Sequence, residues 1–177
     1  MKQFFFALML GVCLTSGSFA KSKVSVEEVI KTSFEDVTTI EPKHLILTKE
    51  QFMQIRSHAK TSIDTKVYRY YNIKGNAKDL GKAVLITRKV RSNKATILYA
   101  FDNKGVLRFS EIMAFGEPPE YIPSSIWMGQ LQNQKPTAKL TVGKDIPTIS
   151  GSTLSALTIT EGARVARALY ETILKSK

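Results

Sequence analysis

The chain has 177 residues, with 26 lysine and arginine residues against 15 aspartate and glutamate residues, a formal net charge of +11. Because 43% of the residues are hydrophobic and no low-complexity segment or internal repeat is visible, the composition predicts a folded globule. One cysteine and two histidines exclude a disulfide framework, a thiolate metal site and a haem attachment motif, and they leave no nucleophile–histidine–acid set for a hydrolase.

The first twenty residues have the three parts of a cleavable signal peptide. Met1–Gln3 is short and basic, Phe4–Leu14 is an unbroken apolar run of eleven residues, and Ser18 and Ala20 are the small residues that a signal peptidase accepts. Eleven helical residues cover only about half of the ~30 Å hydrocarbon core of a bilayer. We therefore expect a signal peptide over residues 1–20, one exported domain over 21–177, and a place in the periplasm or on the outer face of the cytoplasmic membrane. An uncleaved membrane anchor is the alternative.

Two helices are expected before the β-rich part of the chain. Ser25 is the expected N-cap of a first short helix, which has two glutamates in its first turn. Thr48–Gln51 has the spacing of a capping box and predicts a second helix that ends near Ala59.

The middle of the chain predicts an antiparallel sheet. A first strand is expected from the aromatic and branched residues of 67–73, and three more follow over residues 83–90, 95–101 and 106–115. Four-residue turn sequences connect these last three strands, which makes them an antiparallel meander. Along the final strand one face is mostly apolar and the other is mixed, a pattern that predicts a sheet covered by helices on one face.

Helical segments and one more short strand are expected after the sheet. Glu117–Pro119 ends the β pattern, and Pro123 begins a short helix that includes Trp127. Residues 139–142 have the composition of a strand, and an apolar stripe at 3.6-residue spacing predicts a closing helix over 154–175. The predicted fold class is therefore α+β: an antiparallel β-meander packed with helices, ending in a long C-terminal helix.

A glycine and several hydroxyl residues stand at the start of that closing helix; they are Ser150, Gly151, Ser152, Thr153 and Ser155. The first backbone N–H groups of a helix are unpaired and carry partial positive charge, so they favour an anion such as phosphate. Gly151 lets the backbone approach a ligand closely, and the hydroxyl groups can add hydrogen bonds. The alternative is that these residues only cap the helix.

Residues 145–170, DIPTISGSTLSALTITEGARVARALY, resemble the C-terminal signature of the FMN-binding domain family. That family includes the flavin-carrying subunits of the sodium-pumping NADH:quinone oxidoreductase and of the Rnf electron-transport complex, and exported soluble relatives. Further landmarks similar to those of the family occur in the same order: the Asp102–Gly105 turn, Glu117–Pro118, Trp127 and Gln130. The resemblance implies bound flavin mononucleotide (FMN) and a role as an electron carrier rather than as a turnover enzyme.

The resemblance also implies where FMN is held. In that family the threonine or serine that closes the signature can bear FMN through a phosphoester bond, and the matching residue here is Thr153. Pro147 stands where the family has aspartate, and Ser152 stands where it has alanine. We therefore favour non-covalent FMN, with its phosphate at Ser150–Thr153, over covalent attachment at Thr153.

The flat ring of a flavin needs apolar or aromatic contacts. Trp127 is expected to stack on it, with ordinary core packing as the alternative, and Glu117 either hydrogen-bonds the ring or solvates a loop. Because Pro147 and Ser152 depart from the family pattern, a second hypothesis stays open: an exported binding or accessory module of the same fold that has lost the flavin.

Positive charge is concentrated in the middle of the chain. Between Arg56 and Lys104, twelve lysine and arginine residues stand against three aspartates. Such a field attracts acidic or anionic partners, so we expect a redox partner protein that is acidic or membrane-bound. No nucleic-acid partner is expected, since no recognition helix or RNA-binding signature is found. A solvated basic face and attachment to envelope polyanions are the alternatives.

Overall fold

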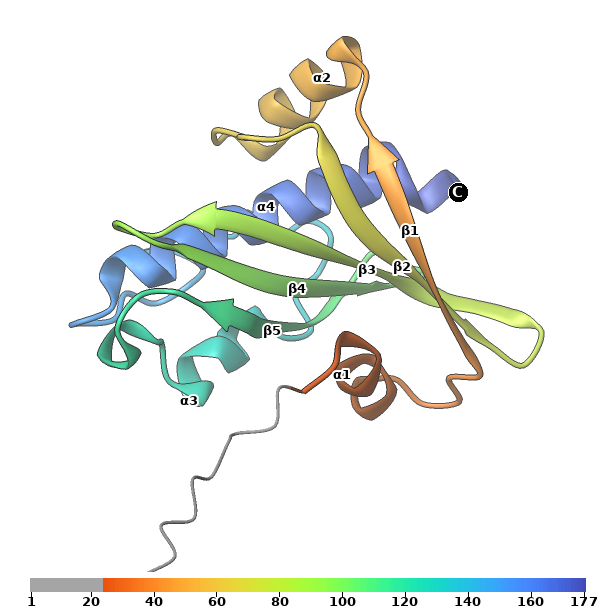
Figure 1. Ribbon diagram of the computed structural model, residues 1–177, viewed down its shortest axis with the longest axis horizontal. Helices are drawn as coiled ribbons and strands as arrows, with labels where there is room; N and C mark the ends of the chain where they lie inside the picture. The colour runs from red at the N-terminus through yellow and green to blue at the C-terminus, as the bar shows by residue number, and fades with distance from the viewer. Residues whose placement is uncertain (1–23) are drawn as a thin grey trace, which may run out of the picture.

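A computed structural model describes residues 24–177, so the expected signal peptide lies outside the described residues. Five strands form one antiparallel sheet in chain order: β1 (Thr39–Ile46), β2 (Val67–Gly75), β3 (Lys78–Lys89), β4 (Lys94–Asp102) and β5 (Leu107–Phe115). The helices are α1 (Val26–Ser33), α2 (Lys49–Ala59), α3 (Ser125–Met128) and α4 (Thr153–Thr172), with single 3₁₀ turns at Pro119–Tyr121, Gly129–Leu131 and Leu174–Ser176 (Figure 1). The predicted α+β class, with its meander and long C-terminal helix, is confirmed.

The two predicted N-terminal helices begin where their caps indicate. The Ser25 hydroxyl accepts a hydrogen bond from the N–H of Glu28 at 3.1 Å, ahead of α1. At α2, Thr48 and Gln51 form both hydrogen bonds of a capping box, at 3.0 and 3.2 Å. Both helices thus begin with orphan N–H groups satisfied by side chains.

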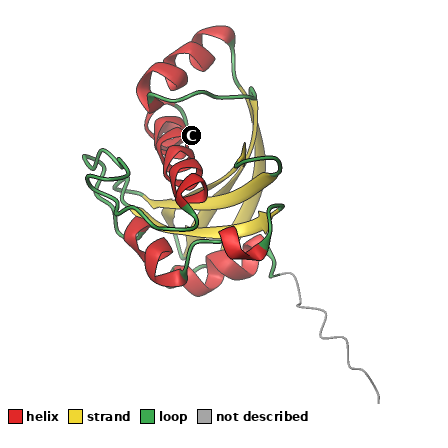
Figure 2. Ribbon diagram, turned by 90° about the vertical axis from the view of Figure 1, so that its left-hand side faces the viewer, coloured by secondary structure: helices red, strands yellow, loops and turns green. Residues whose placement is uncertain are grey.

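Helices cover both faces of the sheet, whereas the sequence pattern predicts cover on one face (Figure 2). On one face, α2 and α4 pack against the larger core, which includes Tyr99, Phe101 and Leu169. On the other face, Ile30 of α1 joins a smaller cluster with residues of four strands: Tyr71, Ile73, Ala83, Leu98, Ala100 and Phe109. The prediction of a single covered face is wrong because the inner strands alternate between two apolar sets.

A β-bulge in β5 explains why its pattern misleads. Phe101 pairs with Leu107 while Ala100 pairs with Phe109, so Arg108 has no partner of its own on β4. Leu107 therefore packs in the larger core and Phe109 in the α1 cluster, although strict alternation places them on the same face. The extra residue turns the strand so that it contributes to both cores.

Two local predictions differ from the structure. β1 was not expected, since its sequence TIEPKHLI contains a proline and four charged or polar side chains; as an edge strand it tolerates both. Conversely, residues 139–142 form no strand, and Val142 makes only an isolated bridge to Ile146. Leu140 has a φ of +53°, a left-handed conformation that breaks an extended segment.

Candidate functional site

The N-terminus of α4 is open. Ser152 occupies the N-cap position, and within the described residues no side chain caps the first turn. Gly151, directly before it, has a φ of +82°, and a Cβ built there would meet no atom within 4 Å. Glycine is thus required by the backbone conformation and not by crowding. The first N–H groups of α4 therefore face a space into which an anion can fit.

The five residues predicted at the start of α4 divide into exposed and buried groups. Ser150, Gly151 and Thr153 are exposed, whereas Ser152 and Ser155 are buried. The Thr153 hydroxyl donates a hydrogen bond to the Ile149 carbonyl at 2.8 Å, which leaves its oxygen able to accept from a ligand. A phosphoester on this oxygen would require that hydrogen bond to break.

A pocket of about 210 Å³ lies over this helix start. Gly151 to Ser155 form one side, and Arg91 and Tyr121 form the other. The Arg91 guanidinium carbon lies 4.8 Å from the centre of the Tyr121 ring, a cation–π contact that steadies a long side chain. Arg91 was missed in the sequence, where it belongs to a four-residue turn; Tyr121 lies in a proline-rich loop, and its place beside Arg91 was not expected. Only the fold brings them to α4.

Glu117 holds the turn that carries Arg91. Its Oε1 accepts hydrogen bonds from the backbone N–H groups of Arg91, Ser92 and Asn93 at 2.9, 2.7 and 2.7 Å. The Asn93 N–H, followed by those of Arg91 and Ser92, keeps the pKa of the Glu117 carboxyl below its usual range. Glu117 thus positions Arg91 and does not line the pocket, so a hydrogen bond from this residue to a flavin ring stays a prediction.

Replacing Glu117 by glutamine is expected to loosen this turn, because an amide oxygen is a weaker acceptor for three N–H groups than a carboxylate. The pKa of Glu117 is lower in the folded protein than in the unfolded chain, where it is about 4.3, so its ionised carboxylate stabilises the fold at any pH above that value. The stabilisation is lost as the pH falls through the folded-state pKa. We expect a lower thermal midpoint for Glu117→Gln at pH 7, and a smaller difference from wild type as pH falls below about 4. Exposed Glu120→Gln is the control. An equal effect of both variants, or a difference independent of pH, would contradict this role.

Trp127 also supports the site, although it does not line the pocket. Its side chain is only 5% exposed and belongs to the larger core. Its ring N–H donates to the Pro147 carbonyl at 2.8 Å, which connects α3 to the segment that leads into α4. Trp127 is absent from the pocket lining, so its stacking on a flavin stays a prediction. Nearer the pocket, Leu154 lies in the lining and is 47% exposed, and Ile122, next to Tyr121, is 42% exposed.

The comparisons with known proteins do not assign this site. Neither a family model nor a curated protein sequence matches the chain. Among residues 24–177, no group of three or more histidine, cysteine, aspartate or glutamate side chains is placed to hold a metal ion. In the same range no helix is long and apolar enough to cross a membrane.

Proposed function

We propose that this protein is an exported FMN-binding flavoprotein that takes part in extracytoplasmic electron transfer. The observation that carries the proposal is the uncapped first turn of α4 facing the Arg91 guanidinium across one pocket. A helix N-terminus and an arginine both favour a phosphate group, and an arginine can bind it through two parallel hydrogen bonds.

The chemistry of the donor set fits FMN. The backbone N–H groups from Gly151 to Ser155 and the Arg91 guanidinium would hold the phosphate, and the Thr153 hydroxyl would donate to it only by giving up its hydrogen bond to the Ile149 carbonyl. A pocket of about 210 Å³ is smaller than the ~300–1,000 Å³ of typical ligand pockets, so we assign it to the phosphate end of the cofactor. Tyr121 and Leu154 supply aromatic and apolar surface for the flat ring at the rim. When bound, FMN would supply reversible electron transfer, and the protein would set its potential by excluding water.

A second function from another class remains a candidate: a binding or accessory module of the same fold without a flavin. It is favoured by the small volume of the pocket and by the burial of Trp127, which leaves fewer groups free for a ring.

We expect protein purified from a flavin-supplemented host to show the absorption bands of oxidised flavin, bleached by dithionite. Arg91→Ala is expected to weaken FMN binding about tenfold, the equivalent of about 1.4 kcal/mol, because a charge-assisted contact to phosphate is lost. The titration would follow quenching of flavin fluorescence. Lys89→Ala is the matched control, since Lys89 is an exposed cation two residues away and outside the pocket lining.

Three outcomes would redirect the proposal. A folded protein that stays colourless after incubation with FMN would favour the flavin-free module. Equal weakening by Lys89→Ala and Arg91→Ala would show that the general positive field, and not the pocket, attracts the anion. A mass increase on Thr153 equal to an FMN phosphoester would show covalent attachment in place of the non-covalent binding that we favour.

The charge near the pocket suits an acidic or membrane-bound redox partner. Several cations of the basic middle are paired, such as Lys74 with Glu41 at 2.7 Å and Arg88 with Glu161 at 2.8 Å. Lys89, Arg91 and Lys94 are exposed around the β3–β4 turn, beside the start of α4. An acidic surface that docks there would approach the proposed flavin directly.

A further inference from the structure

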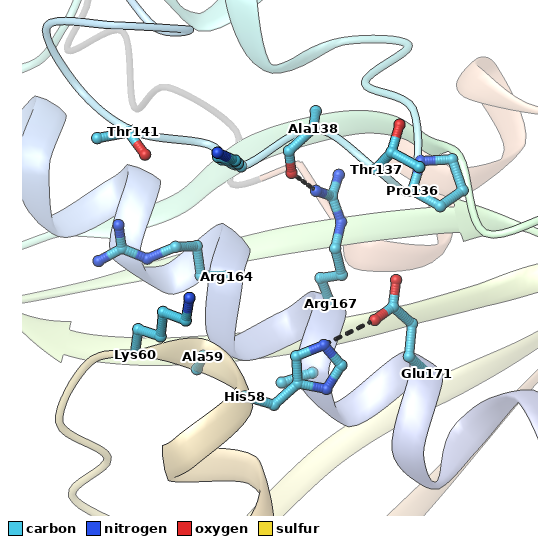
Figure 3. A pocket seen from close by; sticks show the side chains of 12 residues that line it. His58, Ala59, Lys60, Pro136, Thr137, Ala138, Thr141, Arg164, Arg167 and Glu171 are labelled. Carbon is cyan, nitrogen blue, oxygen red and sulfur yellow. Dashed lines mark hydrogen bonds and ion pairs between the residues drawn. The ribbon is translucent and has the colours of Figure 1, made fainter.

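A second hollow, which shares no lining residue with the Arg91 pocket, lies between α2, α4 and the segment 136–141. Its volume is about 350 Å³, within the ~300–1,000 Å³ of typical ligand pockets. Figure 3 shows Lys60, Arg164 and Arg167 around it, with His58 turned towards Glu171. The lining contains four cations, namely Lys60, Lys139, Arg164 and Arg167, against one carboxylate.

Arg167 is the central group of this hollow. It is only 7% exposed, and one of its terminal nitrogens donates to the Ala138 carbonyl. Its Nε and its other terminal nitrogen, Nη2, are buried and have no hydrogen-bond partner within the described residues. Burial lowers the pKa of Arg167, since charge is disfavoured away from water. A buried guanidinium with two unsatisfied nitrogens is costly unless an acceptor is supplied.

The neighbouring charged groups do not supply the missing acceptor for Arg167. The single carboxylate of the lining, Glu171, has its Oε2 3.1 Å from the Nε2 of His58, and within the described residues it makes no ion pair with Arg167. Arg164 also has a buried Nε without a partner in the described part of the chain, and its contact with Glu161 is long, at 3.8 Å. Lys60 and Lys139 are exposed at the edge of the hollow. The hollow therefore has excess positive charge and unused donors, with Glu171 as the single carboxylate of its lining.

We propose that this hollow binds a phosphate group, carried by inorganic phosphate, a small phosphate ester or a phospholipid headgroup. A phosphate has a charge of about −1.5 to −2 at neutral pH and several acceptor oxygens, which match an excess of cations and unpaired guanidinium nitrogens. Arginine is the side chain best suited to bind such a group through two parallel hydrogen bonds. The site is separate from the FMN site and does not depend on it.

The test is calorimetric titration of the full domain with inorganic phosphate and pyrophosphate at matched ionic strength. Wild-type protein is expected to bind, and the double variant Lys60→Ala/Lys139→Ala is expected to bind at least tenfold more weakly. Both lysines are exposed, so this variant should keep the thermal midpoint of the wild type. Lys144→Ala, an exposed loop lysine outside the lining, is the matched control and should bind as wild type does. Arg167→Met should abolish binding; if it unfolds the domain, the lysine variants still decide the question.

Each outcome has a clear reading. Absence of wild-type binding to both the soluble phosphates and vesicles that contain phosphatidic acid, or an equal loss in Lys144→Ala, would overturn the proposal. Flotation with vesicles that contain phosphatidic acid, without binding of soluble phosphates, would assign the hollow to a lipid headgroup; binding of the soluble anions would assign it to free phosphates or small esters. FMN titration of the same variants separates the two sites. The lysine double variant should retain FMN, and its loss of both ligands would show that the hollow belongs to the flavin site.

Discussion

Replacing Gly81 by alanine is expected to lower the free energy of unfolding by about 3 kcal/mol or more. Gly81 lies in β3, paired with Asp102 of β4, and has a φ of +153°. A Cβ at this position would lie 2.0 Å from the carbonyl oxygen of Phe101. That oxygen is part of the backbone of the neighbouring strand and cannot rotate away, so the two strands would have to separate.

Chemical denaturation of Gly81→Ala beside Gly143→Ala would measure this effect. Gly143 also has a positive φ, +81°, but its nearest neighbour to a new Cβ is the methyl group of Thr148 at 3.9 Å. Gly143→Ala should therefore cost only about 1–2 kcal/mol for the unfavourable backbone conformation. If the two variants lost equal stability, the close approach of β3 to β4 would not be the cause.

Alanine at Gly162 is expected to destabilise the protein by about 2 kcal/mol, although alanine normally stabilises a helix by about 1 kcal/mol relative to glycine. Gly162 lies in the middle of α4 where the helix crosses the sheet, and a Cβ there would lie 2.5 Å from the Tyr99 hydroxyl oxygen. That hydroxyl is fully buried and donates to the Ile159 carbonyl at 2.6 Å. Burial raises the pKa of Tyr99, so the hydroxyl stays protonated as a donor.

A double-mutant cycle with Tyr99→Phe isolates this contact. In the phenylalanine background the hydroxyl oxygen is absent, and the nearest remaining ring atoms lie 3.2 and 3.4 Å from the new Cβ. Gly162→Ala should therefore cost less in that background, with a coupling energy of about 1 kcal/mol or more in urea denaturation. Additive effects would mean that α4 moves away from the sheet without strain.

Much of this fold is readable from local sequence patterns. The meander follows from alternating apolar strands joined by short turns, and α2 begins directly after its N-cap, Thr48, because Gln51 completes a capping box. β1 could not be predicted in the same way: Glu41 and Pro42 are poor strand residues, and they are tolerated only because the strand lies at the edge. The cover on the second face also depends on tertiary structure, since the bulge at Arg108 reverses the faces of Leu107 and Phe109.

The candidate site is also only partly readable from the sequence. The hydroxyl-rich entry to α4 is visible in the sequence because its residues are contiguous. The sequence does not show that Arg91 and Tyr121 line the same pocket, because a contact between residues about 30 to 60 positions apart leaves no local pattern. The sequence left Glu117 either to hydrogen-bond the ring or to solvate a loop. In the structure its carboxylate accepts hydrogen bonds from three backbone N–H groups in the turn of Arg91, and such backbone donors leave no trace in the sequence of the turn.

The position of α4 at the end of the chain has a consequence for biosynthesis. Neighbouring strands of the sheet are also neighbours in sequence, so each hairpin can form soon after its residues are made. The longer of the two helices on the larger core is synthesised after all five strands, and until then Tyr99 and Phe101 lack their partners on α4. A nascent chain that has the five strands but not α4 is thus the species most in need of a chaperone, and premature stop codons just before α4 would yield aggregating products rather than shorter working domains.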